Sequence, residues 1–212
     1  MNPDYYGEKY FEWQRAIGRL TGRANLFMYQ PYIGTDDRVV DFGCGGGFLL
    51  KELVCKEKCG VEINPVARDN AISMGIPTVG SIDDLSTGSA DVVISSHALE
   101  HTFDPLGIMT KISGLLKPGG RLVLVTPFER NVNWRPNDIN QHLFTWSPMN
   151  LGNLATKAGF FVETCEVVHH RFPPGALLFE KYLGAKAFHL LCKIWGLVSR
   201  SVVQVRVVAV KT

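Results

Sequence analysis

Two groups of residues in this chain have the types and spacing that chemistry requires. The first is an acid leading into a glycine-rich stretch, Asp41-Phe-Gly-Cys-Gly-Gly-Gly47, with a second acid, Glu62, 21 residues after the first. Glycines let a backbone approach a ligand closely at positive φ, and a carboxylate can accept hydrogen bonds from ribose hydroxyls. The second group is three histidines, His97, His101 and His142, whose type suits proton transfer near neutral pH. These residues therefore predict a cofactor-binding loop beside a group that can transfer a proton.

The spacing of the glycines separates three classes of cofactor site. A phosphate-binding loop needs Lys-Ser or Lys-Thr after its glycines, and neither follows here. The dinucleotide pattern G-x-G-x-x-G/A needs a small residue where Phe48 stands when it is read from Gly43. Read from Gly45, it needs one where Leu50 stands. The pattern that fits is acidic-x-G-x-G-x-G, beginning at Asp41.

This pattern resembles the first motif of class I S-adenosylmethionine-dependent methyltransferases, and the similarity continues in order over residues 37–165. The later matching segments are Val61-Glu-Ile-Asn-Pro65, Gly80-Ser-Ile-Asp-Asp-Leu85, Asp91-Val-Val-Ile-Ser-Ser-His-Ala-Leu-Glu-His101, Leu115-Leu-Lys-Pro-Gly-Gly-Arg-Leu-Val-Leu-Val-Thr-Pro127, His142-Leu-Phe-Thr-Trp-Ser-Pro148 and Ala158-Gly-Phe160. The chain is most similar in type to the small-molecule methyltransferases of ubiquinone and polysaccharide gene clusters. The resemblance implies S-adenosyl-L-methionine as cofactor and S-adenosyl-L-homocysteine as product.

The resemblance also implies a set of cofactor contacts. Asp41 would orient the glycine turn and the methionine amino group, although an Asp in this place can also simply cap a helix. Glu62 would accept the ribose hydroxyls. The loop after the third strand has Ser81 where the family often has Asp, so either Ser81 or Asp83 would take the adenine amino group. The whole expected set is Asp41, Gly43, Cys44, Gly45, Glu62, Ile63, Ser81, Ile82, Asp83 and Ser96, with Ile63 and Ile82 either enclosing the adenine or packing in the core.

Methyl transfer mainly requires that the acceptor be aligned and water excluded, and a hydroxyl acceptor also benefits from a general base. The candidates for that base are His142, His97 and His101, with Glu129 as a fourth. His101 can instead bond the backbone at a helix start, and His97 can merely line the cleft. The five cysteines contain no C-x-x-C pair, so we expect neither a metal site nor a disulfide scaffold.

The elements that must position these residues alternate between strands and helices. We expect strands at 38–42, 59–63, 77–79, 90–95 and 121–126, and helices at 48–54, 65–74 and 105–116. Beyond them we expect a helix at 147–158, begun by Ser147, and strands at 160–168 and 202–210. Such alternation predicts an α/β fold with a doubly wound, Rossmann-like parallel sheet. The resemblance implies about seven strands, an antiparallel C-terminal strand and helices on both faces.

We expect one methyltransferase domain over 1–212. Its parts are N-terminal lid helices at 1–30, a cofactor-binding core at 36–170, an apolar and basic helical insertion at 174–200 and a final strand at 201–212. The first part reads as helix with breaks at Gly18 and Gly22. Its aromatic face, formed by Tyr6, Tyr10 and Trp13, is either a lid that excludes water or a packing surface.

Composition limits the range of partners. The net charge of +2 is too small to indicate nucleic acid, and 46% hydrophobic residues suit a globular core. The chain has no signal peptide pattern and no run of 18 apolar residues, so we expect a cytoplasmic protein without a transmembrane helix.

Two segments bear on the acceptor. The loop 129–146 carries Asn131, Trp134 and Arg135, which suit a hydroxyl-rich or carboxylate-bearing acceptor such as a sugar, or an ordinary ordered loop. We therefore expect a small-molecule or glycan acceptor and O-methylation.

The helix expected at 176–200 has a basic stripe of Lys186, His189, Lys193 and Arg200 beside a broad apolar face. Peripheral contact with a membrane or lipid-linked substrate, a homodimer interface, and packing on its own domain all remain open. Two alternative functions also remain: a catalytically silent cofactor-binding partner subunit, and a nucleotide-dependent oxidoreductase.

Overall fold

The computed structural model describes residues 8–129, 133–134, 136, 138, 140–199 and 203–212. Its elements are α1 (Glu8–Ala24), η1 (Leu26–Met28), η2 (Gln30–Tyr32), β1 (Arg38–Phe42), α2 (Phe48–Glu52), β2 (Glu57–Val61), α3 (Pro65–Ser73), β3 (Thr78–Val79), η3 (Ile82–Asp84), β4 (Ala90–Ser96), η4 (Leu99–His101), α4 (Pro105–Leu115), β5 (Leu116–Phe128), α5 (Pro148–Lys157), β6 (Phe160–Val168), α6 (Ala176–Val198) and β7 (Val203–Lys211), where η marks a short 3-10 helix.

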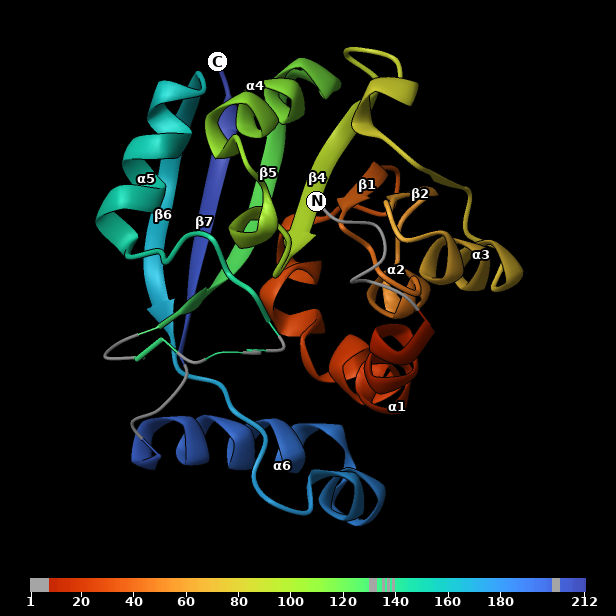
Figure 1. Cartoon of the computed structure of the whole chain (residues 1–212), viewed down its shortest axis with the longest axis vertical. Coiled ribbons are helices and arrows are strands. Elements are labelled where there is room, and N and C mark those ends of the chain that lie inside the picture. The colour runs from red at the N-terminus through yellow and green to blue at the C-terminus, as the bar shows by residue number, and fades with distance from the viewer. Residues whose placement is uncertain (1–7, 130–132, 135, 137, 139, 200–202) are drawn as a thin grey trace.

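The strands form a seven-stranded sheet in the order β3-β2-β1-β4-β5-β7-β6 (Figure 1). The pairs among the first five strands are parallel, whereas β7 runs antiparallel to both β5 and β6. The predicted doubly wound sheet with an antiparallel C-terminal strand is therefore confirmed.

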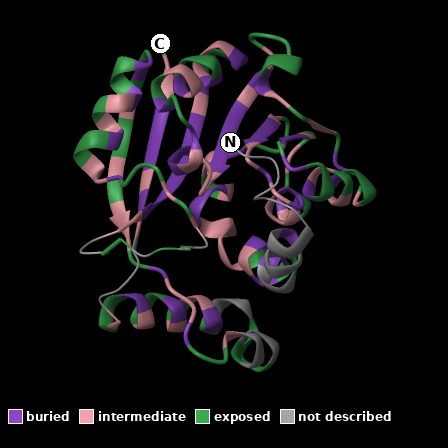
Figure 2. Ribbon diagram, in the orientation of Figure 1, coloured by how far each residue is buried: buried purple, intermediate pink, exposed green. Residues whose placement is uncertain are grey.

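Both faces of the sheet are covered, as the near-continuous apolar strands predict. Val40, Val93 and Leu122 point to one face and pack with residues of α4 and α5. Their neighbours Val39 and Val92 point to the other face and pack with residues of η1, η2 and α2. The central strands are accordingly buried along most of their length (Figure 2).

The predicted helix breaks at Gly18 and Gly22 are wrong, because α1 runs through both residues without interruption. These glycines serve close approach instead. A Cβ on Gly18 would lie 2.3 Å from the ring of Phe48, and one on Gly22 would lie 2.6 Å from the backbone oxygen of Phe48. Glycine thus lets α1 press against the first turn of α2, directly beyond the glycine-rich stretch.

The strand predicted at 59–63 is shifted, since β2 spans Glu57–Val61. The backbone N–H groups of Lys56 and Glu57 donate to the oxygen of Asp37, which starts the pairing with β1 earlier than the apolar residues indicate. The strand then stops before Glu62, so that this acid stands at the carboxyl edge of the sheet.

Helix α6 lies below the sheet and beside α1 (Figure 1). It is broken at Gly184, whose φ of 71° and ψ of 162° are not helical. Its inner side packs through Phe188 and Cys192 against Leu20 of α1.

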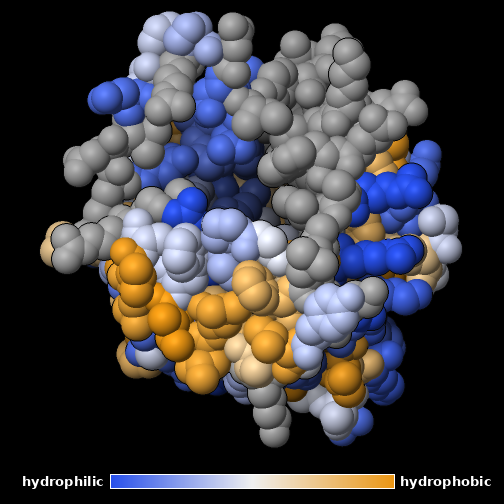
Figure 3. Space-filling view, turned by 90° about the horizontal axis from the view of Figure 1, so that it is seen from below, coloured by the Kyte–Doolittle hydropathy of each residue, from blue (hydrophilic) through white to orange (hydrophobic). Residues whose placement is uncertain are grey.

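Beyond this break, the outer side of α6 exposes an aliphatic face, made of Leu190, Ile194, Leu197 and Val198. Seen from below, apolar side chains gather over this part of the molecule (Figure 3). Within the described ranges, no helix combines the length and the apolarity needed to span a bilayer.

Candidate active site

A cavity of about 870 Å³ lies over the carboxyl ends of the parallel strands. It spans β1 and β4, where the strand order reverses direction, and open α/β sheets bind their ligands at such a switch point. The cavity is lined by all ten residues of the predicted cofactor set, and also by His97, His101, Glu129 and His142. The fold therefore brings together two groups that are separated by up to 101 positions in the sequence. Their roles stay predictions.

The glycine turn after β1 depends on backbone conformations that other residues rarely adopt. Gly43 has a φ of 77°, and a Cβ there would lie 2.4 Å from the Cβ of Ala98. The N–H groups of Gly43 and Cys44 donate to the oxygen of Val61, at 2.8 and 3.2 Å. This ties the turn to the end of β2. Burial raises the pKa of the Cys44 thiol, which therefore stays protonated.

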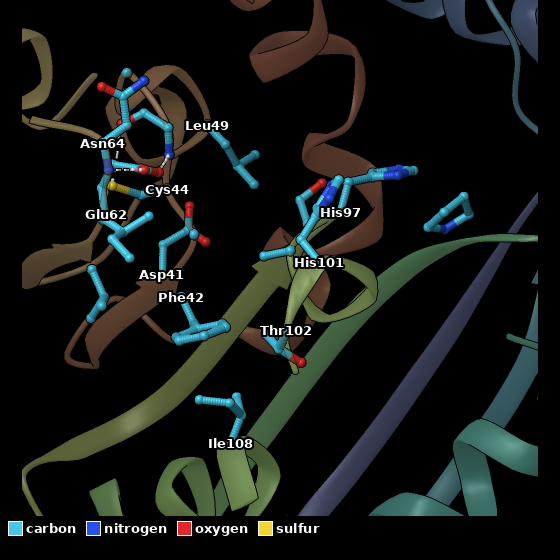
Figure 4. A pocket seen from close by; sticks show the side chains of 18 of the residues that line it. Asp41, Phe42, Cys44, Leu49, Glu62, Asn64, His97, His101, Thr102 and Ile108 are labelled. Carbon is cyan, nitrogen blue, oxygen red and sulfur yellow. Dashed lines mark hydrogen bonds between the residues drawn. The ribbon is translucent and has the colours of Figure 1, made fainter. Parts of the chain in front are cut away.

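Glu62 is held against the turn by backbone donors (Figure 4). Its Oε2 accepts from the N–H of Gly45 and its Oε1 accepts from the N–H of Asn64, each at 2.8 Å. Burial raises the pKa of Glu62, and these two N–H groups oppose that rise. Each carboxylate oxygen has two lone pairs, so both can still accept a bond from a ligand hydroxyl.

Asp41 is the other carboxylate of the cavity, and it is only 2% exposed. Its Oδ1 has no hydrogen-bond partner among the described residues. Burial, with Glu62 nearby, raises the pKa of Asp41 to about 8. A cationic group in the cavity would restore the ionised form, because an opposite charge lowers a carboxyl pKa.

The region predicted to hold adenine lies between β2 and η3. Ile63 is 52% exposed and Ile82 is buried, and both line the cavity. Ser81 caps η3, since its Oγ accepts from the N–H of Asp83 at 3.2 Å. Asp83 itself pairs with Lys111 at 2.6 Å, and this ion pair lowers the pKa of Asp83. Both candidates for the adenine amino group are thus already engaged, but each carboxylate or hydroxyl oxygen retains accepting capacity.

The opposite end of the cavity carries the histidine cluster, which we define as His97, Glu100, His101, Glu129 and His142. Nδ1 of His142 lies 2.9 Å from Oε1 of Glu129, and the His142 and His101 rings meet edge to face at 4.9 Å. Glu100 lies beneath the histidines and is 0% exposed. Burial lowers the pKa of His101. Glu100 opposes this effect, whereas His142 and His97 add to it, and the net lowering leaves the imidazole neutral at pH 7.

Backbone strain accompanies this cluster. In the part of the chain that the structure describes, the non-glycine residues with positive φ are His97, at 54°, and Gln141, at 46°. His97 follows β4, and Gln141 directly precedes His142. Such conformations persist where the surrounding structure imposes them, and they are common at functional sites.

Sequence reasoning overlooked Glu100, which neighbours His97 and His142 without lining the cavity, and several residues of the lining itself. Glu100 lies in the segment Asp91–His101, three residues after His97 and directly before His101. This spacing could have indicated from the sequence that Glu100 lies near the histidines. Thr21 and Asn25 from the α1 end, and His170 and Phe172 before α6, also line the cavity, with no local signal that reveals this.

The structure does not place several other predicted residues in the cavity lining. Trp134 is 86% exposed and does not line the cavity. Asn131, Arg135 and Tyr6 lie outside the described residues, and so do the side chains of Tyr10 and Trp13. The N-terminal lid and the binding of a sugar by loop 129–146 therefore stay predictions.

Comparison with known proteins agrees with this architecture. A family model described as a methyltransferase domain matches residues 10–164. A ubiquinone biosynthesis O-methyltransferase from Xanthomonas euvesicatoria pv. vesicatoria (strain 85-10) is 38% identical over 101 residues, and the match covers 42% of this chain and 42% of that protein. The chain thus matches less than half the length of this curated relative.

Solved structures share the fold at low identity. A chain in the complex of the Haloferax volcanii Trm112 methyltransferase activator with a methyltransferase superposes with a TM-score of 0.68 at 20% identity, covering 99% of this chain and 97% of that one. A SAM-dependent methyltransferase from Archaeoglobus fulgidus superposes with a TM-score of 0.66 at 19% identity, covering 95% and 99%.

Proposed function

Because the chain belongs to the methyltransferase domain family, we propose that it transfers a methyl group from S-adenosyl-L-methionine to a hydroxyl of a small molecule. The product derived from the cofactor is S-adenosyl-L-homocysteine. The observation that carries this proposal is the single cavity that holds the Asp41 and Glu62 carboxylates at one end and the histidine cluster at the other.

The residues at the first end fit this cofactor. Asp41 has a buried oxygen without a partner among the described residues, and it suits the ammonium group of the methionine part. Glu62 has two oxygens with remaining accepting capacity, and it suits the ribose hydroxyls. The glycine turn leaves no room for a side chain at Gly43 and so keeps backbone next to the ligand. When bound, the cofactor supplies a methyl group that its sulfonium already activates.

The second end suits a hydroxyl acceptor. Such an acceptor must lose a proton, and His97, His101 and His142 surround the place where it would do so. The Glu129 carboxylate accepts from Nδ1 of His142, which orients that ring. The O-methyltransferase name of the Xanthomonas relative supports oxygen as the methylated atom. Between a glycan and another small molecule, the printed name of the same relative, which refers to ubiquinone biosynthesis, supports a small molecule other than a glycan.

The aliphatic face of α6 supports peripheral contact with a membrane that holds such an acceptor. Residues 170–172, which lead into α6, line the cavity, so α6 follows shortly after one of its walls in the chain. A homodimer through the same face is the alternative, whereas packing of α6 on its own domain uses only the inner side.

The assignment of 1–212 to one methyltransferase domain, with 1–30 as a lid, also stays a proposal, as does the cytoplasmic location.

The histidine cluster and its strained backbone argue against the catalytically silent subunit, since a subunit that only binds cofactor has no use for either. Phe48 argues against the oxidoreductase, because its ring stands where the dinucleotide turn needs a small residue.

Calorimetry tests the cofactor assignment first. We expect S-adenosyl-L-homocysteine to bind with micromolar affinity and NAD not to bind. NAD binding without S-adenosyl-L-homocysteine binding would refute the proposal. A panel of phenolic, catecholic and sugar acceptors with methyl-labelled cofactor then tests transfer, and labelling of no hydroxyl compound would argue for the silent subunit.

Flotation with vesicles containing anionic lipid tests the role of α6. We expect the wild-type chain to float and the Ile194→Asp/Leu197→Asp variant to remain in the lower fractions. Sedimentation of a wild-type dimer that this variant disrupts, without flotation, would favour the homodimer.

A further inference from the structure

Glu100 is a carboxyl side chain buried without a hydrogen bond. Neither of its carboxylate oxygens has a hydrogen-bond partner among the described residues. Oε1 lies 3.6 Å from Nδ1 of His97 and 3.9 Å from Nε2 of His142. These separations exceed those of hydrogen bonds, and a buried carboxylate normally has either a paired charge or a metal ion. The carboxylate and the two nitrogens therefore surround a place that a cation would complete.

Three possible ligand atoms converge around the same Glu100 carboxylate, and they include His101 rather than His97. One atom each from Glu100, His101 and His142 lies within 4.8 Å of the others. Ligands bonded at about 2.1 Å in a tetrahedral zinc site lie about 3.4 Å from one another, so small rotations of these side chains would close the site. The backbone supports this arrangement. The backbone N–H of Leu143 donates to the backbone carbonyl oxygen of Glu100 at 2.9 Å, and this bond holds the His142 segment against η4.

The surroundings of His142 are those of a metal ligand. An ionised carboxylate only accepts hydrogen bonds, so the 2.9 Å contact with Glu129 places the proton of His142 on Nδ1. Nε2 is then left with its lone pair directed toward Glu100 and His101. A carboxylate bonded to the second nitrogen of a histidine is the usual support of a histidine ligand in metal sites.

We propose that Glu100, His101 and His142 bind one divalent cation at the acceptor end of the cavity, an inference that rests on the proposed methyl transfer. Two histidines and one carboxylate are a known ligand set for zinc with an open fourth position. His101 and His142 line the cavity, so the open position faces the acceptor. This assignment differs from the expectation, drawn from cysteine spacing alone, that the chain has no metal site.

The cation would act on the acceptor proton. Coordination of a hydroxyl to a divalent cation lowers the pKa of that hydroxyl. The O–H bond then breaks, the electron pair stays on the acceptor oxygen, and the proton passes to His97 or to water. His97 is outside the three ligands, and its side chain is 35% exposed toward the cavity. In this arrangement His142 holds the cation, and His97 receives the proton.

Metal titration of the full chain without an affinity tag tests the proposal. The background is a Cys55→Ser/Cys165→Ser variant, which removes the partly exposed thiols that could bind zinc elsewhere. After EDTA treatment and dialysis, we expect about one Zn²⁺ per chain by calorimetry and elemental analysis. Co²⁺ in its place should give visible absorption bands of a four- or five-coordinate site.

Glu100→Gln should weaken Zn²⁺ binding at least tenfold and abolish the Co²⁺ bands. It removes a buried charge while keeping the side-chain shape, so folding should persist, and His142→Ala serves as a second ligand variant. His169→Ala is the matched control, because His169 is exposed and lies outside the cluster, and it should bind Zn²⁺ like the background.

S-adenosyl-L-homocysteine titrations separate this inference from the proposed function. Glu100→Gln should keep binding S-adenosyl-L-homocysteine, and Glu62→Ala should keep binding Zn²⁺. Absence of stoichiometric Zn²⁺, or Zn²⁺ binding that survives both ligand substitutions, overturns the metal site even where S-adenosyl-L-homocysteine binds. If the wild-type chain does not bind S-adenosyl-L-homocysteine, the proposed function is overturned. The Zn²⁺ titrations of the wild-type and variant chains then decide whether the metal site exists.

Discussion

The two ends of the cavity are built in different ways. At the Asp41 and Glu62 end, neighbouring strands β1 and β2 deliver both acids, and backbone N–H groups already hold Glu62. The positive φ angles there belong to glycines, which adopt them at little cost. At the histidine end, the side chains come from the segment that follows β4, from η4 and from the loop after β5. The positive φ angles there belong to His97 and Gln141, and Glu100 is buried without a hydrogen bond.

The difference indicates a division of labour. A relaxed, backbone-bonded end suits a ligand that the whole family shares, since a local sequence motif can specify it completely. A strained end with a buried carboxyl that lacks a hydrogen bond suits an acceptor and its chemistry, because such features persist only where the rest of the fold imposes them. Substitutions at the first end should therefore change cofactor affinity, and those at the second end should change turnover.

His142→Ala should give the largest effect. Loss of the ring should lower turnover about 100- to 10,000-fold, the usual contribution of a positioned acid–base group or ligand. S-adenosyl-L-homocysteine affinity should stay within about twofold, because Asp41 and Glu62 are untouched. Single-turnover methyl transfer and calorimetry measure the two quantities, with His169→Ala as control. Equal losses of turnover and of S-adenosyl-L-homocysteine affinity would contradict the claim that the two ends of the cavity have different roles.

Glu62→Ala should produce the converse result. Removing a carboxylate that holds the turn and can accept ribose hydroxyls should weaken S-adenosyl-L-homocysteine binding about 10- to 100-fold, since hydrogen bonds to charged groups contribute about 1.5–3 kcal/mol. Glu57→Ala, at the exposed first residue of β2, should leave affinity unchanged. Calorimetry checks both variants, and equal affinities would remove Glu62 from the cofactor site.

Gly22→Ala tests whether the first end depends on the close approach of α1. A Cβ would lie 2.6 Å from the Phe48 backbone oxygen, and backbone cannot move aside cheaply, so the unfolding free energy should fall by about 1–3 kcal/mol. Gly114→Ala, in α4 with open space around it, should instead raise stability by up to about 1 kcal/mol. Urea denaturation measures both, and a stabilised Gly22→Ala variant would contradict the packing argument.

Asp41 should give the smallest effect, through pH. With its pKa at about 8, the carboxyl is mostly protonated in the unliganded chain at pH 7. A bound ammonium favours the ionised form, so binding releases a proton and S-adenosyl-L-homocysteine affinity should rise roughly fivefold from pH 7 to pH 8, then level off.

Calorimetry in buffers of different ionisation enthalpy detects that proton. Asp41→Asn should remove the pH dependence, whereas Asp36→Asn, on the exposed loop before β1, should keep it. Proton uptake on binding would reverse the argument. The same raised pKa implies that this carboxyl stabilises the unliganded fold most at low pH, and that its contribution is lost as pH rises through about 8.

Much of the first end was predictable because its determinants are contiguous. Asp41 and the glycines lie within seven residues, and Glu62 follows at the end of the neighbouring strand. Apolar periodicity predicted the sheet and its strand types for the same reason, since each strand carries its own pattern. The register of β2 was predicted less well, because polar Glu57 and Lys58 pair with β1 while showing no apolar signal.

The sequence by itself therefore determined the sheet, the glycine turn and the two acids that point to the methyl donor. Only the tertiary structure decided that Gly18 and Gly22 serve packing rather than helix termination, and that Trp134 does not line the cavity. It also decided that Glu100 is buried between histidines 3 and 42 residues away. The physical reason is that conformation follows from neighbours in the chain, whereas burial and charge pairing follow from residues that meet only after folding.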